Sequence, residues 1–329
     1  MAPATPLLDL SGLLSPDAAA SGVKLMAKAE YNQPGWSMKD RIAEHILMSA
    51  IQSGKLAAPG GTVVAASSGN TGASVAMWCA RLGLKSVIIT DKKCSQEKKD
   101  SIKAYGAELI VAEKGQDYMA MEIALGKENP DWFTFDQYNN PLNSEAHYLT
   151  TGKEIWDQTN GQVSHFVMTA STGGTITGVS RFLKENQPKI EVVLADPEGS
   201  ALCHYVRTKD LVQPPTKTII EGAGKLNIPG VLDITNINDV IQVSDKSALT
   251  MCHTIARSQG LLVGGSSGVN VHAATELANT LREPSVVVTL LCDSGIKYLS
   301  KVFSDDWLTE NGMGEVVELN KEALATKVN

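Results

Sequence analysis

The chain has 329 residues, a formal net charge of −7, and a composition that is 43% hydrophobic and 20% charged. These values are typical of a globular protein of about two domains, and the mild, dispersed negative charge argues against nucleic acid or an anionic membrane as the main partner. The five cysteines form no CxxC pair and the six histidines show no HxxxH or HExxH spacing. We therefore expect a cytoplasmic protein with reduced thiols, no structural metal and no membrane span. Residues 1–6 are expected to form a short loose tail.

The first expected helix follows the segment QPGWSMKDR (33–41) and carries Lys39 in its first turn. Ser37 with Asp40 is interpreted as a capping pair, and the apolar residues behind them recur at helical spacing. Because Lys39 would lie at the positive end of the helix dipole, its pKa should be lowered, and a neutral amine is what Schiff-base formation requires. Taken alone, the ordinary interpretation of this stretch is a surface lysine beside an acidic cap.

From residue 62 onward, short apolar runs alternate with amphipathic segments. Buried strands are expected at 62–66, 86–90, 107–112, 165–170, 191–195, 239–243 and 286–291, with a further short apolar run at 261–263. Helices are expected at 73–84, 96–105, 118–126, 144–158 and 246–258, before 186 and after 268. This rhythm predicts an α/β fold of two lobes, each a mostly parallel sheet covered by helices, with the site in the cleft between them.

The division into lobes is predicted from the same alternation. We assign residues 33–143 to a smaller N-terminal lobe, and residues 1–32 together with 144–329 to a larger one. The region 207–236 is rich in proline and glycine and is expected to surround the cleft.

Clusters of small polar residues occur at four expected strand ends. SSGNTG (67–72) and STGGT (171–175) each lie between a strand and a helix, where free amides and hydroxyls can hold an anion. The second cluster lacks the lysine of a P-loop and suits a small phosphate, although an ordinary cap or a tight turn would use the same residues. GGSSG (264–268) suggests close packing of a flat group. In CDSGIKYLSKVFSDDWL (292–308), a simple helix cap formed by Asp293 and Ser294 is the favoured interpretation.

Together with Lys39, these motifs resemble the cysteine synthase and cystathionine β-synthase family of pyridoxal-phosphate enzymes, which have the tryptophan-synthase-β type of fold (fold type II). The resemblance runs from TPLL at Thr5 to SDDWL at Leu308. The motifs follow in family order: SMKDR, SSGNTG, QYNNP, TTGKEIW, STGGTITG, DPEGS and GLLVGGSSG.

The resemblance implies roles for matching positions. Lys39 corresponds to the lysine that forms a Schiff base with pyridoxal 5′-phosphate, Asn70 to the asparagine that bonds the cofactor's ring hydroxyl, and Ser266 to the serine that faces the pyridine nitrogen. The phosphate cradle would consist of Ser171, Thr172, Gly173, Gly174 and Thr175. The substrate carboxylate would be held by Ser67, Ser68, Gly69, Thr71 and Gln137.

A neutral serine at position 266 need not protonate the ring nitrogen, which favours β-elimination and addition over transamination. The resemblance thus implies a ping-pong β-replacement on serine, O-acetylserine or O-phosphoserine with a thiol or sulfide, giving cysteine or cystathionine. An amine nucleophile giving a 2,3-diaminopropionate-type product, a serine or threonine β-eliminase, and a catalytically idle sensing subunit are the alternatives. The family is commonly dimeric, so a homodimer is expected.

Four positions depart from the family pattern. Gln33 and Pro34 stand where Asn-Pro or Asn-Ala is usual, Ala66 stands in the segment that is usually Glu-Pro-Thr, and Ser171 replaces the glycine that usually opens the phosphate cradle. These positions are expected to border the substrate or the phosphate. We therefore expect them to influence the choice of substrate or nucleophile.

Overall fold

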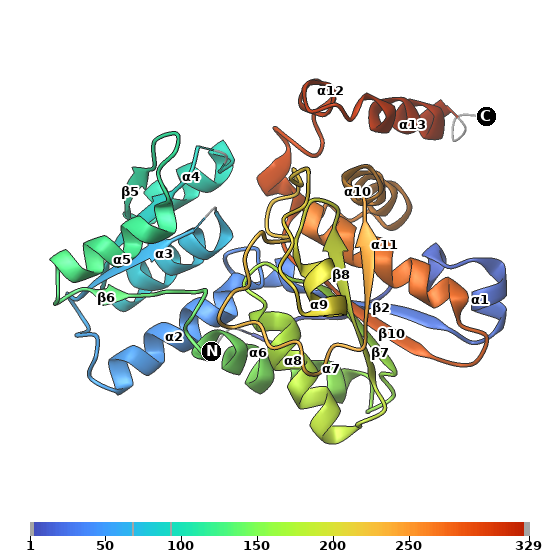
Figure 1. The fold of residues 1–329 in the computed structure, drawn as a ribbon, viewed down its shortest axis with the longest axis horizontal. Coiled ribbons are helices and arrows are strands. Elements are labelled where there is room, and N and C mark those ends of the chain that lie inside the picture. The colour runs from blue at the N-terminus through green and yellow to red at the C-terminus, as the bar shows by residue number, and fades with distance from the viewer. Residues whose placement is uncertain (1–2, 68, 93, 326–329) are drawn as a thin grey trace.

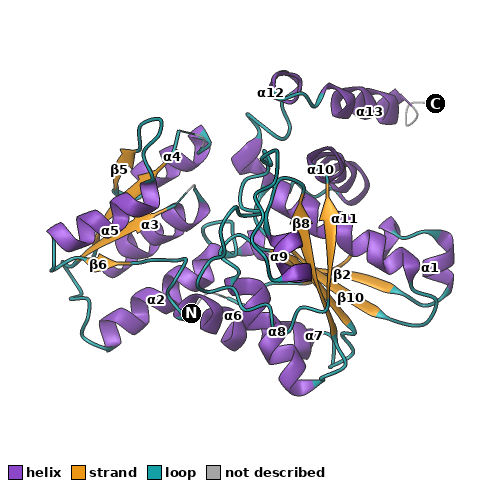
Figure 2. Ribbon diagram, in the orientation of Figure 1, coloured by secondary structure: helices purple, strands orange, loops and turns teal. Residues whose placement is uncertain are grey.

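The computed structural model describes residues 3–67, 69–92 and 94–325, in which helices and strands alternate along the chain (Figures 1 and 2). The larger of its two sheets contains, in spatial order, β1 (Leu7–Asp9), β2 (Lys24–Ala29), β10 (Val286–Leu291), β7 (His165–Thr169), β8 (Glu191–Pro197) and β9 (Asp239–Val243). The smaller contains β5 (Glu108–Val111), β4 (Lys85–Thr90), β3 (Thr62–Ala66) and β6 (Phe133–Thr134). Neighbouring strands run parallel except β1, which is antiparallel to β2.

Helices cover both sheets, and Figure 1 shows the smaller sheet with its helices on the left and the larger sheet on the right. The helices near the smaller sheet are α2 (Lys39–Gln52), α3 (Asn70–Leu82), α4 (Gln96–Ala104) and α5 (Tyr118–Glu128). The remainder are α1 (Pro16–Ala20), α6 (Leu142–His147), α7 (Lys153–Gln158), α8 (Gly174–Asn186), α9 (Leu202–Thr208), α10 (Asp245–Gln259), α11 (Gly265–Thr280), α12 (Asp305–Glu310) and α13 (Gly314–Ala325). None of the helices in these ranges is long and apolar enough to cross a membrane.

Small residues explain how α11 reaches the centre of the larger lobe. This helix packs on β10, β7 and β8, and α10 covers its other side. A side chain at Gly268 would lie 2.1 Å from the carbonyl oxygen of Ala248, so only glycine allows this close approach of the two helices. The tight packing fixes the first turn of α11, including Ser266, against the carboxyl end of the sheet.

Most of the expected elements are present. The strands expected at 62–66, 239–243 and 286–291 have these bounds, and the other four expected strands agree within two residues at each end. The run 261–263 is not a strand: the chain leaves α10 at Gly260 and enters α11 at Gly265, and only Val263 forms an isolated bridge. The helices expected after 268 and from 73 begin earlier, at the glycine-rich motifs themselves.

The expected loose tail is wrong for residues 3–6, and residues 1 and 2 lie outside the described part of the chain. Thr5 is only 2% exposed, and the carbonyl of Pro6 accepts a hydrogen bond from the Ala29 amide at 2.9 Å. The segment is anchored because it leads into β1 at the sheet edge. The lobe boundary at residue 143 stays a prediction, since α6 spans it and contacts both α2 and α8.

Candidate active site

The position of Lys39 is set by a short pairing between the two lobes. The Met38 amide donates to the Cys292 carbonyl at 2.9 Å, and the Ser294 amide donates to the Trp36 carbonyl at 3.1 Å. Residues 292–294 directly follow β10, so these bonds attach the start of α2 to the carboxyl end of a central strand. Lys39 therefore belongs to a helix of one lobe and lies at the strand ends of the other, where α/β folds bind ligands.

The interpretation of Ser37 and Asp40 as a capping pair is wrong. Met38 is the N-cap, and the Ser37 hydroxyl accepts only a long hydrogen bond from the Lys39 amide at 3.4 Å. The Asp40 carboxylate instead accepts from the Gly35 amide and from the Ser74 hydroxyl on α3. Close packing of α2 on α3 explains the difference, because it buries Asp40 beside Ser74.

Burial lowers the pKa of the Lys39 amine, while Cys292 and Asp293 oppose the shift. The direction agrees with the expectation from sequence, and desolvation is the largest cause. The amine forms no hydrogen bond or ion pair within the described part of the chain. A desolvated lysine without a fixed partner can become a nucleophilic amine.

Two connected hollows surround Lys39 and collect most of the expected site residues. The first is lined by Lys39, Asn70, Ser171, Thr172, Gly173, Thr175 and Ser266, with Met38, Met168, Thr169, Gly222 and Cys292. The second shares Lys39 and Asn70 and adds Ser67, Thr71, Lys98, Gln137, Tyr138, Glu221 and Tyr298. Gly69 and Gly174 belong to the same loops but line neither hollow, and Ser68 lies outside the described residues.

An outer cleft of about 550 Å³ borders both hollows, with which it shares Ser171 and Gly222 in its lining. The segment 217–226 forms one wall of this cleft, within the loop-rich region that sequence placed around it. Along the chain this segment lies between α9 and β9, and Figure 1 shows the yellow loops that follow α9 in the middle of the molecule.

The loop before α8 fits a phosphate group. Gly173 has a φ of 83°, and α8 begins without a side-chain cap, so the amides of its first turn lack intrahelical partners. A side chain at Gly174 would lie 1.9 Å from Asn143 Oδ1, which keeps the backbone close and the turn tight. The Thr169 hydroxyl nearby is buried and has no partner among the described residues. The Gly174 amide donates to the Thr172 hydroxyl at 3.3 Å, and the other amides of the first turn, next to the unsatisfied Thr169 hydroxyl, form an anion site.

Asn70 is held by a group of polar side chains that we call the Asp293 cluster: Asn70, Lys98, Glu221, Asp293, Lys297 and Tyr298. Asp293 Oδ2 accepts from Asn70 Nδ2 and from the Tyr298 hydroxyl, both at 2.6 Å, while Lys297 donates to Asn70 Oδ1 at 3.1 Å. The Lys98 ammonium donates to the Tyr298 hydroxyl at 2.9 Å and to the Glu221 carboxylate at 2.7 Å. The orientation of Asn70 is thus fixed from both ends of its amide.

Gln137 and Ser266 occupy different surroundings. Gln137 accepts from the Thr71 hydroxyl and donates to the Ala66 carbonyl, both at 2.7 Å, so both ends of its amide are already bonded. The Ser266 hydroxyl bonds the Cys292 thiol, whose pKa burial raises to about 12. The Cys292 thiol is therefore uncharged. No carboxylate lies among the described residues that line the first hollow.

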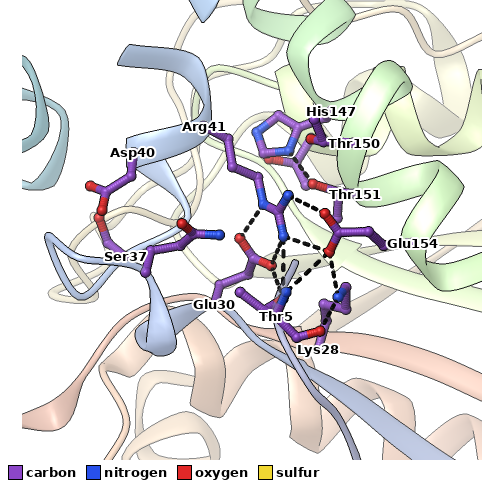
Figure 3. A network of polar contacts seen from close by, with 12 residues as sticks. Thr5, Lys28, Glu30, Ser37, Asp40, Arg41, His147, Thr150, Thr151 and Glu154 are labelled. Carbon is purple, nitrogen blue, oxygen red and sulfur yellow. Dashed lines mark hydrogen bonds and ion pairs between the residues drawn. The ribbon is translucent and has the colours of Figure 1, made fainter. Parts of the chain in front are cut away.

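Sequence reasoning assigned no role to Arg41, although it is two residues from Lys39. Figure 3 shows its guanidinium between Glu30 and Glu154, which it bonds at 2.6–2.8 Å, with Thr5 and Lys28 completing a group that we call the Arg41 cluster. Burial lowers the pKa of Arg41, but the two carboxylates outweigh it and raise that pKa above its ordinary value. A single charged residue in a sequence gives no sign of partners 11 and 113 residues away.

Three of the four departures from the family pattern, Gln33, Pro34 and Ala66, line neither the hollows nor the cleft. Gln33 is 1% exposed and donates to the Pro3 carbonyl at 2.9 Å, and neither it nor Pro34 lines the two hollows or the cleft. The expectation that these two border the substrate is therefore wrong, because the chain turns at Trp36, with φ of 59°, before it reaches Lys39. Ser171 lines both hollows and the cleft.

A lysine amine whose pKa is lowered by burial, in the same hollow as a helix start that can hold an anion, defines a site for a carbonyl cofactor with an anionic group. Comparisons with known proteins identify the family. A family model described as pyridoxal-phosphate dependent enzyme matches residues 2–293, and this chain belongs to that family. Its cofactor is pyridoxal phosphate.

Named relatives narrow the class. Cysteine synthase 1 of Emericella nidulans is 35% identical over 329 residues, covering 97% of this chain and 87% of that protein. The cysteine synthase of Staphylococcus aureus (strain Mu50) is 37% identical over 302 residues, covering 90% and 93%. The cystathionine beta-synthase of Dictyostelium discoideum is 38% identical over 295 residues, covering 88% of this chain but only 58% of that protein.

A solved structure supports the fold. The crystal structure of O-ureido-L-serine synthase matches with a TM-score of 0.83 at 30% identity, covering 93% of this chain and 96% of that chain. The predicted fold type II architecture and the predicted class, a β-replacing pyridoxal-phosphate enzyme of the cysteine synthase and cystathionine β-synthase group, are confirmed.

Proposed function

We propose that this enzyme replaces the β-substituent of serine or an activated serine, O-acetylserine or O-phosphoserine, with a thiol or sulfide, giving cysteine or cystathionine. The observation that carries the proposal is the desolvated Lys39 amine in the wall shared by both hollows. One hollow has the uncapped start of α8, and the other has the hydroxyl-rich start of α3. A cofactor phosphate and a substrate carboxylate can thus be held on two sides of one amine.

Pyridoxal phosphate, when bound, supplies the electron sink that makes the Cα proton of an amino acid acidic. Lys39 would hold the cofactor and then, once its amine is free, take the Cα proton at Nζ and later return it. Asn70 would face the ring hydroxyl, Ser266 the ring nitrogen, and the amides of residues 171–175 the phosphate. The Cβ–O bond of the donor breaks with its electron pair on oxygen, and a thiolate sulfur then forms the new bond to Cβ.

The substrate carboxylate would be held at the start of α3. Ser67 and Thr71 line the second hollow, and Gln137 fixes the Thr71 hydroxyl. We propose that Gln137 acts mainly by orienting Thr71, because both ends of its amide are already bonded. A cytoplasmic homodimer is part of the same proposal: the compartment rests on the cysteine pattern of the sequence, and the dimer rests on the resemblance alone.

The test is a titration of the loaded enzyme with serine, O-acetylserine and O-phosphoserine, followed by the visible absorption of the cofactor and by product analysis. The expected result is a spectral change with at least one donor and a thioether or cysteine product after a thiol or sulfide is added. Release of pyruvate without any thiol would identify a β-eliminase instead. Products formed only with amines would identify the diaminopropionate-type reaction.

A further inference from the structure

The outer cleft is positively charged although the protein is acidic. Its described lining contains five lysines, Lys92, Lys99, Lys217, Lys225 and Lys301, but only two carboxylic acids. The whole chain has a formal charge of −7, so this concentration of cations is local. A cleft with one sign of charge and low-dielectric walls concentrates ligands of the opposite sign.

Two of these lysines are paired with carboxylates. Lys301 binds Glu221, which also holds Lys98, and Lys92 pairs with Glu113 at the surface. Lys225 differs, because its ammonium donates to the Tyr138 hydroxyl at 2.8 Å and has no carboxylate within 4.0 Å among the described residues. Its charge is therefore directed into the cleft without a countercharge in contact.

Lys225 lies where the cleft meets the hollows. Tyr138, its partner, lines both the cleft and the second hollow, and the Tyr138 hydroxyl also bonds Ser171. Ser171 in turn lines the cleft and both hollows. A group bound beside Lys225 would thus lie at the border between the cleft and the second hollow, the hollow that the proposed function assigns to the substrate.

The side chain is also held in place from both ends. At the backbone end, the Lys225 amide donates to the Ser200 hydroxyl at 3.0 Å, and this hydroxyl donates to the Lys225 carbonyl at 3.1 Å. At the other end, the ammonium lies 4.0 Å from the centre of the Tyr138 ring. Burial lowers the pKa of this lysine, and the nearby Tyr118, Asp117 and Asp91 only oppose that shift. A bound anion would stabilise the protonated form of Lys225, which burial disfavours.

We propose that Lys225, positioned by Tyr138, is the specificity-determining residue for a small anionic group, carboxylate or phosphate, carried on the β-side of the reacting amino acid. The anion can come from the leaving group, which gains negative charge as the Cβ–O bond breaks, or from the nucleophile that enters the same space. This inference deepens the proposed β-replacement and rests on it.

The experiment compares two matched pairs of substrates in the loaded wild-type enzyme and in Lys225→Met. The first pair is O-acetyl-L-serine and O-phospho-L-serine with 2-mercaptoethanol, and the second is 2-mercaptoethanol and 3-mercaptopropionate with O-acetyl-L-serine. The expected result is a loss of kcat/KM of about 10- to 100-fold for the anionic member only, the factor for one charge-assisted hydrogen bond. A loss in the first pair assigns the leaving group, and a loss in the second assigns the nucleophile.

Two further variants keep the result specific. Lys217→Met removes the same charge from an exposed position in the same cleft and should leave both ratios of kcat/KM within about 3-fold of wild type, as expected for a screened surface charge. Lys225→Arg should retain the preference for the anion. Tyr138→Phe keeps the lysine but removes its hydrogen-bond partner, and it should lower the preference for the anionic substrate by a smaller factor. If Lys225→Met does not fold, Tyr138→Phe provides the test.

Equal losses for neutral and anionic members, or no loss in either pair, would overturn the role of Lys225. Failure of the proposed function has a different signature, because wild type would then turn over no donor with any thiol. In that case the dissociation constants of O-phospho-L-serine and L-serine, read from the absorption of the loaded enzyme, still test Lys225. Lys225→Met should raise the dissociation constant of O-phospho-L-serine and leave that of L-serine unchanged.

Discussion

The two buried charge groups beside Lys39 differ in how completely they are satisfied. The Arg41 cluster holds two cations and two carboxylates, the Arg41 and Glu30 side chains are fully buried, and no member of the cluster lines the hollows. In the Asp293 cluster, one oxygen of Asp293 is buried without a partner among the described residues, while Asn70, Lys98, Glu221 and Tyr298 line the second hollow. A buried cluster whose charges are all paired serves the fold, whereas a cluster with an unpaired oxygen can still form a hydrogen bond with a ligand.

This comparison predicts that changes at the site reduce activity with little effect on stability, and that changes in the Arg41 cluster do the reverse. The largest effect is expected for Lys39→Ala. The loss of the amine that holds the cofactor and moves the Cα proton should lower kcat by about 10³-fold or more. Steady-state rates and the visible absorption of the cofactor measure it.

Lys39→Ala should leave the unfolding transition in place, because the amine contributes no hydrogen bond or ion pair to the described structure. Lys92→Ala, at an exposed surface pair, is the matched control and should change neither property. Full activity in Lys39→Ala would contradict the proposed chemistry.

The next largest effect is expected for Arg41→Met. The substitution leaves Glu30 buried without its cation and Glu154 paired with Lys28 alone, and the loss of a buried partner costs about 3–5 kcal/mol of unfolding free energy. Denaturant unfolding monitored by circular dichroism measures it. The double variant Arg41→Met/Glu30→Gln should recover part of the loss, since it removes one uncompensated charge.

Lys153→Met provides the surface comparison for Arg41→Met, because Lys153 pairs with Asp157 on one exposed helix face. It should change the stability little. An equal loss of unfolding free energy in Lys153→Met and Arg41→Met would mean that the buried Arg41 cluster does not stabilise the fold more than a surface ion pair does.

A smaller effect, which depends on pH, is expected for Lys297→Met. Burial lowers the pKa of Lys297 from 10.5 to about 8, so its ammonium loses its proton in the range where the enzyme can be assayed. Because this ammonium holds Asn70 Oδ1, the cofactor absorption should titrate near pH 8 in wild type and lose that step in the variant. We expect kcat to fall about 10-fold, the cost of one charge-assisted hydrogen bond.

The stability of the wild type should respond to the same proton. The unfolded chain keeps the Lys297 proton up to its ordinary pKa of 10.5 while the folded protein releases it at about 8, so the unfolding free energy rises with pH between these values. Lys297→Met removes that rise. Asp293→Asn should move the titration below pH 8, because Asp293 raises the pKa of Lys297. A step near pH 8 that survives in Lys297→Met belongs to another group.

The same contrast explains what the sequence could predict. Strands such as β3 and β10 are continuous apolar runs, and the glycine-rich motifs follow them directly, so local pattern alone placed Asn70, Ser171 and their loops at strand ends. The strands β1 and β2 gave no such pattern, and β2 pairs with β10, more than 250 residues further along the chain. The role of Arg41 and the remoteness of Gln33 likewise depend on contacts between distant segments, which periodicity does not encode.

The smallest effect is expected for Thr5→Val, and it tests how far the closed cluster extends. The Thr5 hydroxyl donates to Glu30 Oε1 at 2.7 Å and accepts from Arg41 at 3.2 Å. Valine has the same shape but leaves one oxygen of Glu30 with Arg41 alone, so the unfolding free energy should fall by about 1–2 kcal/mol. Activity should not change, since Thr5 lines neither hollow. A loss of activity without a loss of stability would show that the Arg41 cluster acts on the position of Lys39, and the division between a structural group and a site group would then fail.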